Sequence, residues 1–198
     1  KTNSATGCDH WEVKYFKGVT DQYADWLGDI LSLVEEQVAW PRSILTNTIT
    51  LMGKPKGGAR PIALMPMLYR IWTKIRKGQI QTWDKGWVAL WDAAVAGSSA
   101  LRAAVLTAFN NELAKYTAQQ IDKLLWGMDK FNDTIDMLKL MVRAMEMEYP
   151  ILILALGLQM HLAPRVLRGH HHYEHCLLPA GALIAGCTQS SFFARIFL

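Results

Sequence analysis

A turn rich in glycine and lysine, set between two short apolar runs, constrains the fold of this chain more than any other feature. Residues 45–52 alternate loosely and contain β-branched threonine and isoleucine, which favour strands. Residues 54–58, KPKGG, have the composition of a tight turn, and residues 60–64 are again short and apolar. The sequence therefore predicts a β-hairpin with three basic residues at or beside its tip, Lys54, Lys56 and Arg60.

Helical spacing of apolar residues organises most of the remaining chain. We expect helices at residues 21–38, from Pro66 to about Lys77, from a cap at Ser98 or Ser99 to about Gln120, from a cap at Asp133 or Thr134 to before Pro150, at residues 151–163, and from Thr188 onward. The glycine-rich residues 78–97 are expected to form loops, residues 124–128 a buried strand, and residues 165–180 a hairpin. The predicted fold class is α+β, mostly helical around a small antiparallel sheet.

Two apolar stripes predict which helix faces are buried. In the first helix the stripe consists of Trp26, Ile30, Leu33 and Val34, and in the helix before Pro150 it consists of Ile135, Leu138, Met141, Val142 and Met145. Residues at these spacings lie on one side of a helix. We therefore expect these two sides to face the protein core.

Composition places the chain among globular proteins. Its 198 residues are 51% hydrophobic and 19% charged, which excludes a wholly disordered chain and allows one domain with a substantial core. The three cysteines, Cys8, Cys176 and Cys187, form no pairing pattern, and the polar start resembles no secretory signal. The longest apolar run, residues 151–158, is too short to span a bilayer. We expect an intracellular protein, nuclear or cytoplasmic, with no membrane partner.

Positive charge is concentrated in one stretch of the chain. Residues 54–85 contain eight lysine or arginine residues and one acidic residue, Asp84, so the whole positive surplus lies there. Within this stretch, Arg70, Lys74 and Lys77 form a stripe on one side of the expected helix. A basic stripe followed by tryptophans is typical of surfaces that bind RNA or DNA. The alternative interpretation, a solvated helix face over core tryptophans, stays open.

Two clusters contain residue types that ligate metals. The segment 170–176, HHHYEHC, lacks a second ligand pair at zinc-finger spacing and is interpreted as an exposed hairpin tip. Four carboxylates would suit Mg²⁺ if they converged: Asp122, Asp129, Asp133 and Asp136. Asp133 stands where it can cap a helix, and Asp136 falls in the first turn, where the helix dipole favours a carboxylate, so both are interpreted as structural. No metal site is predicted from these spacings.

Four motifs, in order, resemble a reverse transcriptase domain, an RNA-directed DNA polymerase, of the non-LTR retroelement and group II intron type. Residues 53–62, GKPKGGARPI, look like the fingers signature, and residues 68–71, LYRI, look like the helix that follows it. Residues 124–136, LLWGMDKFNDTID, resemble the first palm motif, and residues 181–190, GALIAGCTQS, resemble the second. The resemblance covers roughly residues 45–198.

The resemblance implies fingers and the first part of a palm, with an N-terminal segment at 1–43, a fingers-like region at 44–120 and a partial palm at 121–198. Both ends look truncated, and the missing palm half is expected to be needed to complete the fold. In this family, basic residues of the fingers hairpin contact the nucleotide triphosphate, an aromatic residue gates the sugar, and the second palm motif lines the site. Carried over, the nucleotide-binding set is Lys54 or Lys56, Arg60, Phe131 or the adjacent Asn132, Gly186 and Ser190.

The catalytic carboxylates are the main departure from the family. Gly127 occupies the position of the first metal-binding Asp, and Asp129 is two residues further on. Because magnesium coordination is geometrically strict, we do not assume that Asp129 substitutes. Ala185 replaces the glutamine before Gly186, and the later pair of adjacent Asp residues would lie beyond Leu198. An intact relative would bind Mg²⁺ on its palm carboxylates, whereas this chain is expected to use no cofactor.

We therefore expect a truncated and degenerate reverse-transcriptase-like fragment that is catalytically inactive as given. Two alternatives stay open. One is a non-catalytic nucleic-acid-binding module that uses Arg70, Lys74 and Lys77 on its basic fingers face. The other is a helical interaction or structural protein whose motif match is fortuitous.

Overall fold

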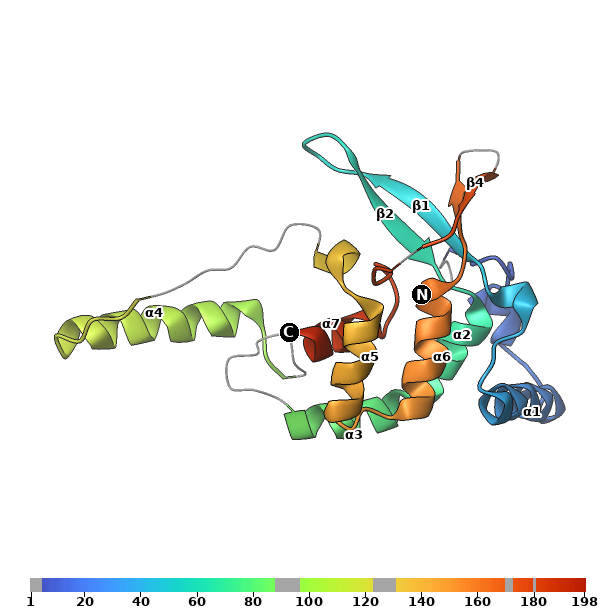
Figure 1. The fold of residues 1–198 in the computed structure, drawn as a ribbon, viewed down its shortest axis with the longest axis horizontal. Coiled ribbons are helices and arrows are strands. Elements are labelled where there is room, and N and C mark those ends of the chain that lie inside the picture. The colour runs from blue at the N-terminus through green and yellow to red at the C-terminus, as the bar shows by residue number, and fades with distance from the viewer. Residues whose placement is uncertain (1–4, 88–96, 123–130, 170–172, 180) are drawn as a thin grey trace. The chain divides into compact units, whose positions relative to one another are not determined.

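The computed structural model describes residues 5–87, 97–122, 131–169, 173–179 and 181–198. By its internal contacts the chain divides into two compact units, residues 1–81 with 130–198 and residues 82–129. These borders differ from the expected divisions at 43/44 and 120/121. The described residues form a mixed α and β structure that is mostly helical, as predicted (Figure 1).

The elements follow the chain in a largely helical order. The described helices are α1 (Asp21–Gln37), α2 (Met67–Ile75), α3 (Lys77–Trp87), α4 (Ala100–Tyr116), α5 (Met137–Glu146), α6 (Ile151–Leu162) and α7 (Ser190–Phe197), with short 3-10 turns η1 (Val13–Phe16), η2 (Arg42–Ile44) and η3 (Phe131–Thr134). The strands are β1 (Asn47–Gly53), β2 (Ala59–Leu64), β3 (Arg165–Arg168) and β4 (Tyr173–Leu177). None of the described helices is long and apolar enough to cross a membrane.

Most predicted elements are confirmed where they fall on described residues. The helices expected at 21–38 and 151–163 are present, and Ser99 caps α4 by accepting a hydrogen bond from the main-chain N–H of Arg102 at 3.1 Å. The hairpin around the KPKGG turn is present as β1 and β2, and the hairpin at 165–180 is present as β3 and β4. The strand expected at 124–128 lies outside the described residues.

The described strands form one four-stranded sheet in the order β2-β1-β3-β4. The two hairpins are antiparallel, but β1 and β3 are parallel, with Asn47 opposite Arg165. The prediction of an antiparallel sheet was therefore wrong for this central pair. The two hairpins are joined by a long crossover through helices, and such a connection returns the chain in the same direction.

The β1–β2 hairpin extends beyond the rest of the sheet (Figure 1). β3 pairs with β1 only from Asn47 to Thr50, so the distal half of the hairpin has no third strand. Burial falls in the same direction, from fully buried residues at the start of β1 to exposed residues at its end. The basic turn is thus held in solvent by a hairpin that is anchored at its base.

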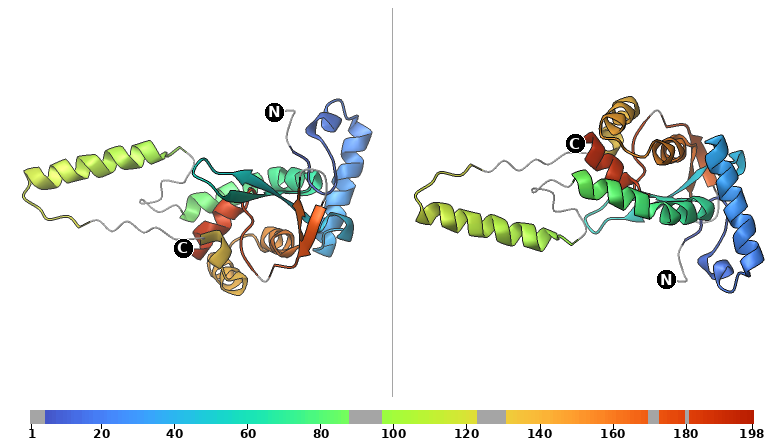
Figure 2. Two further views of the ribbon diagram at one scale, coloured as in Figure 1. Left: turned by 90° about the horizontal axis from the view of Figure 1, so that it is seen from above. Right: turned by 90° about the horizontal axis from the view of Figure 1, so that it is seen from below.

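Helix α6 forms the centre of the core. Seven of its twelve residues are buried, and its sequence is apolar on every side, as expected of a helix enclosed by other elements. Helix α5 lies beside α6 in Figure 1 and in the two views of Figure 2. Two side chains from the segment before and at the start of β1 bind its main chain: Trp40 Nε1 donates to the carbonyl of Leu156 at 2.9 Å, and Asn47 Nδ2 donates to that of Met160 at 2.7 Å.

Gly157 allows α7 and its preceding residue to pack closely on α6. A Cβ at this position would lie 2.8 Å from Cζ of Phe193 and would also overlap Oε1 of Gln189. Both partners are fully buried, and Gln189 Oε1 accepts a hydrogen bond from the Tyr69 hydroxyl at 3.2 Å. The absence of a side chain on α6 therefore makes room for a polar link to α2.

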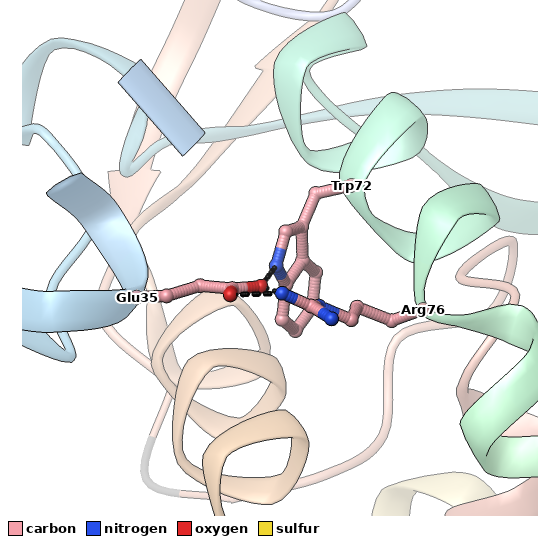
Figure 3. Close-up of polar contacts among 3 residues, drawn as sticks. All are labelled: Glu35, Trp72 and Arg76. Atoms are coloured by element: carbon pink, nitrogen blue, oxygen red, sulfur yellow. Dashed lines mark hydrogen bonds and ion pairs between the residues drawn. The ribbon is translucent and has the colours of Figure 1, made fainter. Parts of the chain in front are cut away.

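An ion pair joins α1 to α2 (Figure 3). Arg76 Nε donates to Glu35 Oε1 at 2.5 Å, Arg76 Nη2 pairs with Glu35 Oε2, and Trp72 Nε1 donates to Oε1 at 2.6 Å. Burial raises the pKa of Glu35, but the hydrogen bonds from Arg76 and Trp72 outweigh it and hold the pKa below its ordinary value. The carboxylate is therefore charged in the folded protein at neutral pH.

Two predicted helix faces were wrong. In α1, Trp26, Ile30 and Leu33 of the predicted face are exposed. Val34 of that face is buried as expected, together with Leu31. In α5, the buried residues are Met137, Leu140 and Ala144, whereas the exposed ones are Leu138, Met141, Val142 and Met145; Ile135, just before the helix, is buried as expected. Both helices carry more apolar residues than one face can hold. In α1, the buried face is the one that carries Leu31 and also Glu35, which pairs with Arg76. For α5, contact with α6 and α7 selects the face that carries the small residue Ala144.

Two local predictions were also wrong. Residues 77–87 form α3 rather than loop, because Ile80 and Trp83 are buried on one side of it (2% and 9% exposed) and offset the cost of Gly78 and Gly86. Residues 88–96 lie outside the described residues. Helix α5 is capped by Asp136, whose Oδ1 accepts hydrogen bonds from the main-chain N–H groups of Leu138 and Lys139. Asp133 and Thr134 belong to η3 instead.

Replacing Gly157 by alanine tests the packing of α7 on α6. We expect Gly157→Ala to lower the free energy of unfolding by about 1–3 kcal/mol, because the added methyl group displaces Gln189 and Phe193. Gly28→Ala is the matched control, since Gly28 is also inside a helix but a Cβ there would meet no atom within 4 Å. The control is expected to be neutral or stabilising by up to about 1 kcal/mol. Urea denaturation measures both, and equal effects would contradict the packing argument.

Removing the charge of Glu35 tests the link between α1 and α2. Glu35→Gln is expected to lower the free energy of unfolding at pH 7 by about 1–3 kcal/mol, because Arg76 loses its charged acceptor. Since the folded pKa is depressed, the wild type loses this contribution as pH falls below the ordinary glutamate value of 4.5 and through the folded pKa, and the variant does not. Thermal unfolding between pH 7 and pH 3 measures the difference. The exposed neighbour Glu36, changed to Gln, should leave the wild-type acid profile intact.

Candidate functional site

A cavity of about 570 Å³ lies against the β1–β2 hairpin. Four parts of the chain line it: Ile49 and residues 60–63 of the hairpin, residues 131–133 of η3, Arg165 of β3, and residues 183–186. Most of these side chains are apolar, and the charged ones are Arg60, Arg165 and Asp133. The described lining thus combines an apolar wall with a net positive charge.

Main-chain hydrogen bonds hold the loop 183–186 in place at the cavity. The N–H of Ala63 on β2 donates to the carbonyl of Ala185 at 2.9 Å, and the N–H of Leu183 donates to the carbonyl of Asn132 at 2.8 Å. The loop is therefore fastened to the hairpin on one side and to η3 on the other. The cavity wall is fixed by backbone contacts that do not depend on which side chains line it.

Gly186 is required by this arrangement for two reasons. Its φ is +108°, a conformation that residues with a Cβ rarely adopt. A Cβ there would also lie 2.8 Å from the carbonyl oxygen of Ala63. The glycine of the second palm-like motif therefore stands where the loop crosses β2.

His161, near the end of α6, forms a hydrogen bond with the loop 183–186. Its side chain is fully buried, and Nδ1 accepts a hydrogen bond from the main-chain N–H of Ile184 at 3.0 Å, which leaves the ring proton on Nε2. Burial lowers the pKa of His161 to about 3, and the nearby charge of Arg165 adds to this effect. The imidazole is therefore neutral and acts as a hydrogen-bond acceptor for the cavity wall.

Arg165 begins β3 at the cavity. Its Nη2 donates to three main-chain carbonyls, those of His161, Gly181 and Ala182, at 3.2 to 3.4 Å. The side chain is half-buried, and this burial lowers the pKa of the guanidinium, while the charge of Asp133 opposes the shift. Arg165 therefore brings a partly desolvated positive charge to the cavity.

The structure brings together part of the predicted nucleotide-binding set. Arg60, Phe131 and Gly186 line the cavity, and so does Asn132, although these residues come from three separate motifs. Lys54 and Lys56 are exposed at the hairpin tip and are not among the residues that line it. Ser190 also lies outside the lining, and its hydroxyl instead donates to the carbonyl of Ile184 at 2.6 Å.

The predicted catalytic positions are not described by the structure. Gly127 and Asp129 both lie in the segment 123–130, outside the described residues. Within the described part of the chain, Asp133 is the one carboxylate that lines the cavity, and no group of three His, Cys, Asp or Glu side chains gathers anywhere. These residues do not fit the magnesium site of an intact relative, and we derive no chemistry through a metal.

The basic stripe divides between two elements. Arg70 and Lys74 of α2 line a second cavity of about 340 Å³, which also includes Gly186. Arg70 Nη1 donates to the carbonyl of Ala5 at 3.4 Å. Lys77 is exposed at the start of α3 and is not among the residues that line this cavity. Two of the three predicted nucleic-acid-binding residues therefore share a site.

Sequence reasoning did not identify Arg165 or His161 as site residues. His161 is the only ionisable residue in the apolar segment 151–162, and this could have predicted a buried polar contact. The sequence does not indicate that its partner is Ile184. Arg165 directly follows Pro164 and is the first residue of a short strand, and no sequence motif includes it. The parallel pairing of β1 and β3 places both residues near the β1–β2 hairpin, because it brings the end of α6 next to that hairpin.

Comparison with known proteins adds no assignment. No protein-family model matches the chain, and no curated protein matches it significantly.

The neutral state of His161 makes the stability of the protein sensitive to mild acid. Its folded pKa of about 3 is below the ordinary value of 6.5, so the unfolded chain binds a proton first as pH falls. The contribution of neutral His161 to the free energy of unfolding is therefore fully present above pH 6.5 and is lost as pH falls toward 3. We expect the free energy of unfolding to fall by about 2 kcal/mol between pH 7.5 and pH 5.

Urea denaturation at these two pH values measures this loss. His161→Asn should flatten the pH dependence, because the Asn Oδ1 keeps an acceptor for Ile184 but does not titrate. The exposed His10, changed to Asn, is the control and should keep the wild-type slope. A variant at position 161 with an unchanged slope would contradict this assignment.

Proposed function

We propose that this chain is a reverse-transcriptase-like fragment, with fingers and the first part of a palm, that binds nucleoside triphosphates in the cavity at the β1–β2 hairpin. The observation that supports this proposal is the gathering of Arg60, Phe131 and Gly186 around one cavity. Each belongs to a different motif in the sequence, and the fold brings all three to the same place.

The lining has the chemistry that a nucleotide needs. The apolar residues Ile49, Pro61 and Ile62 offer a surface for a base and a sugar, and the Phe131 ring offers a flat face. The guanidinium of Arg60 supplies forked donors that suit a phosphate. Small-molecule sites commonly combine an apolar wall with a few charged or polar groups, as here.

The proposed fragment binds nucleotides without polymerising them. Two-metal phosphoryl transfer needs several converging carboxylates, and Gly127 stands at the first such position in the motif. Among the described residues the cavity offers Asp133 alone. In an intact relative, Mg²⁺ on palm carboxylates would supply that chemistry.

The alternative of a nucleic-acid-binding module has partial support. Arg70 and Lys74 line one cavity, which places two cations where a phosphodiester backbone could bind. Arg76, which follows these two residues, is paired with Glu35. The nucleotide cavity is the stronger proposal because three motifs converge on it.

Titration with a fluorescent deoxynucleoside triphosphate analogue tests the proposal. The wild-type chain is expected to bind, and Arg60→Ala to weaken binding about tenfold or more, because a charge-assisted hydrogen bond is lost. Lys56→Ala is the matched control, since it removes one positive charge from the same hairpin outside the cavity lining. The control should change affinity by less than about twofold.

Two results would contradict the proposal. The first is absence of nucleotide binding by a folded wild-type chain. The second is an equal loss in the Arg60 and Lys56 variants, which would indicate general attraction of anions to the hairpin. Primer extension on an RNA template is expected to yield no product, and extension would show that the catalytic part of the proposal is wrong.

A further inference from the structure

Arg165 is held rigidly at the cavity. Its main chain is part of β3 and lies opposite Asn47 in the parallel register with β1. Asn47 is itself fully buried and donates a hydrogen bond to the carbonyl of Met160 at 2.7 Å. The main chain of Arg165 is thus held in place by the sheet and, through Asn47, by α6. The position of its Cα at the cavity is therefore fixed.

The hydrogen bonds of Arg165 do not exhaust its donors. Nη2 contacts three carbonyl oxygens, but Nε is buried and has no hydrogen-bond partner in the described structure. A buried donor without a partner is costly, and such groups are uncommon in folded proteins. The described residues therefore leave one donor of Arg165 without an acceptor, and Arg165 lines the cavity.

Among the described residues, the charge of Arg165 has no carboxylate partner in an ion pair. The described ion pairs do not include it, although Asp133 lies near enough to favour its charged form. Carbonyl oxygens stabilise a guanidinium only partly, and half of this side chain is removed from water. Phosphate suits such a group because it is anionic and accepts hydrogen bonds from the planar fork of arginine.

We infer that Arg165 binds the phosphate of the ligand in this cavity, as a second phosphate contact besides Arg60. This inference rests on the proposed function only in taking a nucleotide as the ligand. The shared chemistry is a phosphate group, which free phosphate also presents. Arg165 is a binding residue in this inference, and its contacts with the carbonyls of His161, Gly181 and Ala182 orient it.

Comparison of a nucleotide with its nucleoside tests the inference. Wild type and Arg165→Gln are titrated calorimetrically with dAMP and with deoxyadenosine. We expect the variant to lose about tenfold to a hundredfold in affinity for dAMP and less than about twofold for deoxyadenosine. Arg168→Gln is the matched control, because Arg168 ends the same strand, is exposed and does not line the cavity. It should bind both ligands as wild type does.

A purely structural role of Arg165 predicts a different result. If this side chain only ties the loop at 181–182 to α6, the variant loses affinity for dAMP and deoxyadenosine by the same factor. That result, or unchanged affinity for dAMP, would overturn the inference and leave the proposed nucleotide site standing.

A second measurement covers the case in which Arg165→Gln does not fold. Inorganic phosphate is added to the wild type at constant ionic strength, and the midpoint of thermal unfolding is followed. We expect phosphate to raise the midpoint of the wild type relative to chloride. The rise should be smaller in Arg165→Lys, which keeps the positive charge but loses the paired donors of the guanidinium. A wild-type chain that responds to phosphate but binds neither dAMP nor deoxyadenosine would contradict the proposed function and retain the anion site. No response to phosphate in the wild type, together with no preference for dAMP over deoxyadenosine, would overturn the inference.

Discussion

Helix α6 is apolar on every side, and the larger unit of the protein is arranged around the need to enclose it. Its main-chain carbonyls accept hydrogen bonds from Trp40 and Asn47, and Gly157 admits Gln189 and Phe193. A single helix is thereby in contact with the strand β1, the segment before α7 and, through Gln189 and Tyr69, with α2. Because these contacts share one helix, a change in its position would alter the base of the hairpin and the cavity together.

The cavity is built mainly by backbone contacts. The loop 183–186 is bonded to β2 and to η3 through main-chain groups, and His161 accepts a third hydrogen bond from it. Gly186 is the residue of this wall at which a Cβ would lie 2.8 Å from the carbonyl oxygen of Ala63.

Positive charges in the larger unit have at least three kinds of surroundings. Arg76 is neutralised by Glu35 and serves to dock α1, whereas Arg60 and Arg165 face a cavity that has Asp133 as its one described carboxylate. Lys54 and Lys56 remain in solvent at the end of the hairpin. The positive surplus that is evident in the sequence is therefore divided among a structural pair, a cavity and an exposed turn.

Local signals in the sequence were sufficient for most of the described elements, with α3 as the exception. Turn composition located the β1–β2 hairpin, helical spacing located α1 and α6, and the cap of α4 was narrowed to Ser98 or Ser99. Each of these depends on residues close together in the chain. The sequence also named Arg60, Phe131 and Gly186 as members of one site through a resemblance in motif order.

The tertiary structure alone decided which faces are buried, that β1 and β3 are parallel, that Arg165 lines the cavity and that His161 accepts a hydrogen bond from its wall. It also placed Asp9 at the start of α2, where its carboxylate accepts hydrogen bonds from the N–H groups of Met67 and Leu68. In each case the partners are far apart in sequence. Their meeting depends on how helices and strands pack, and no local spacing records it.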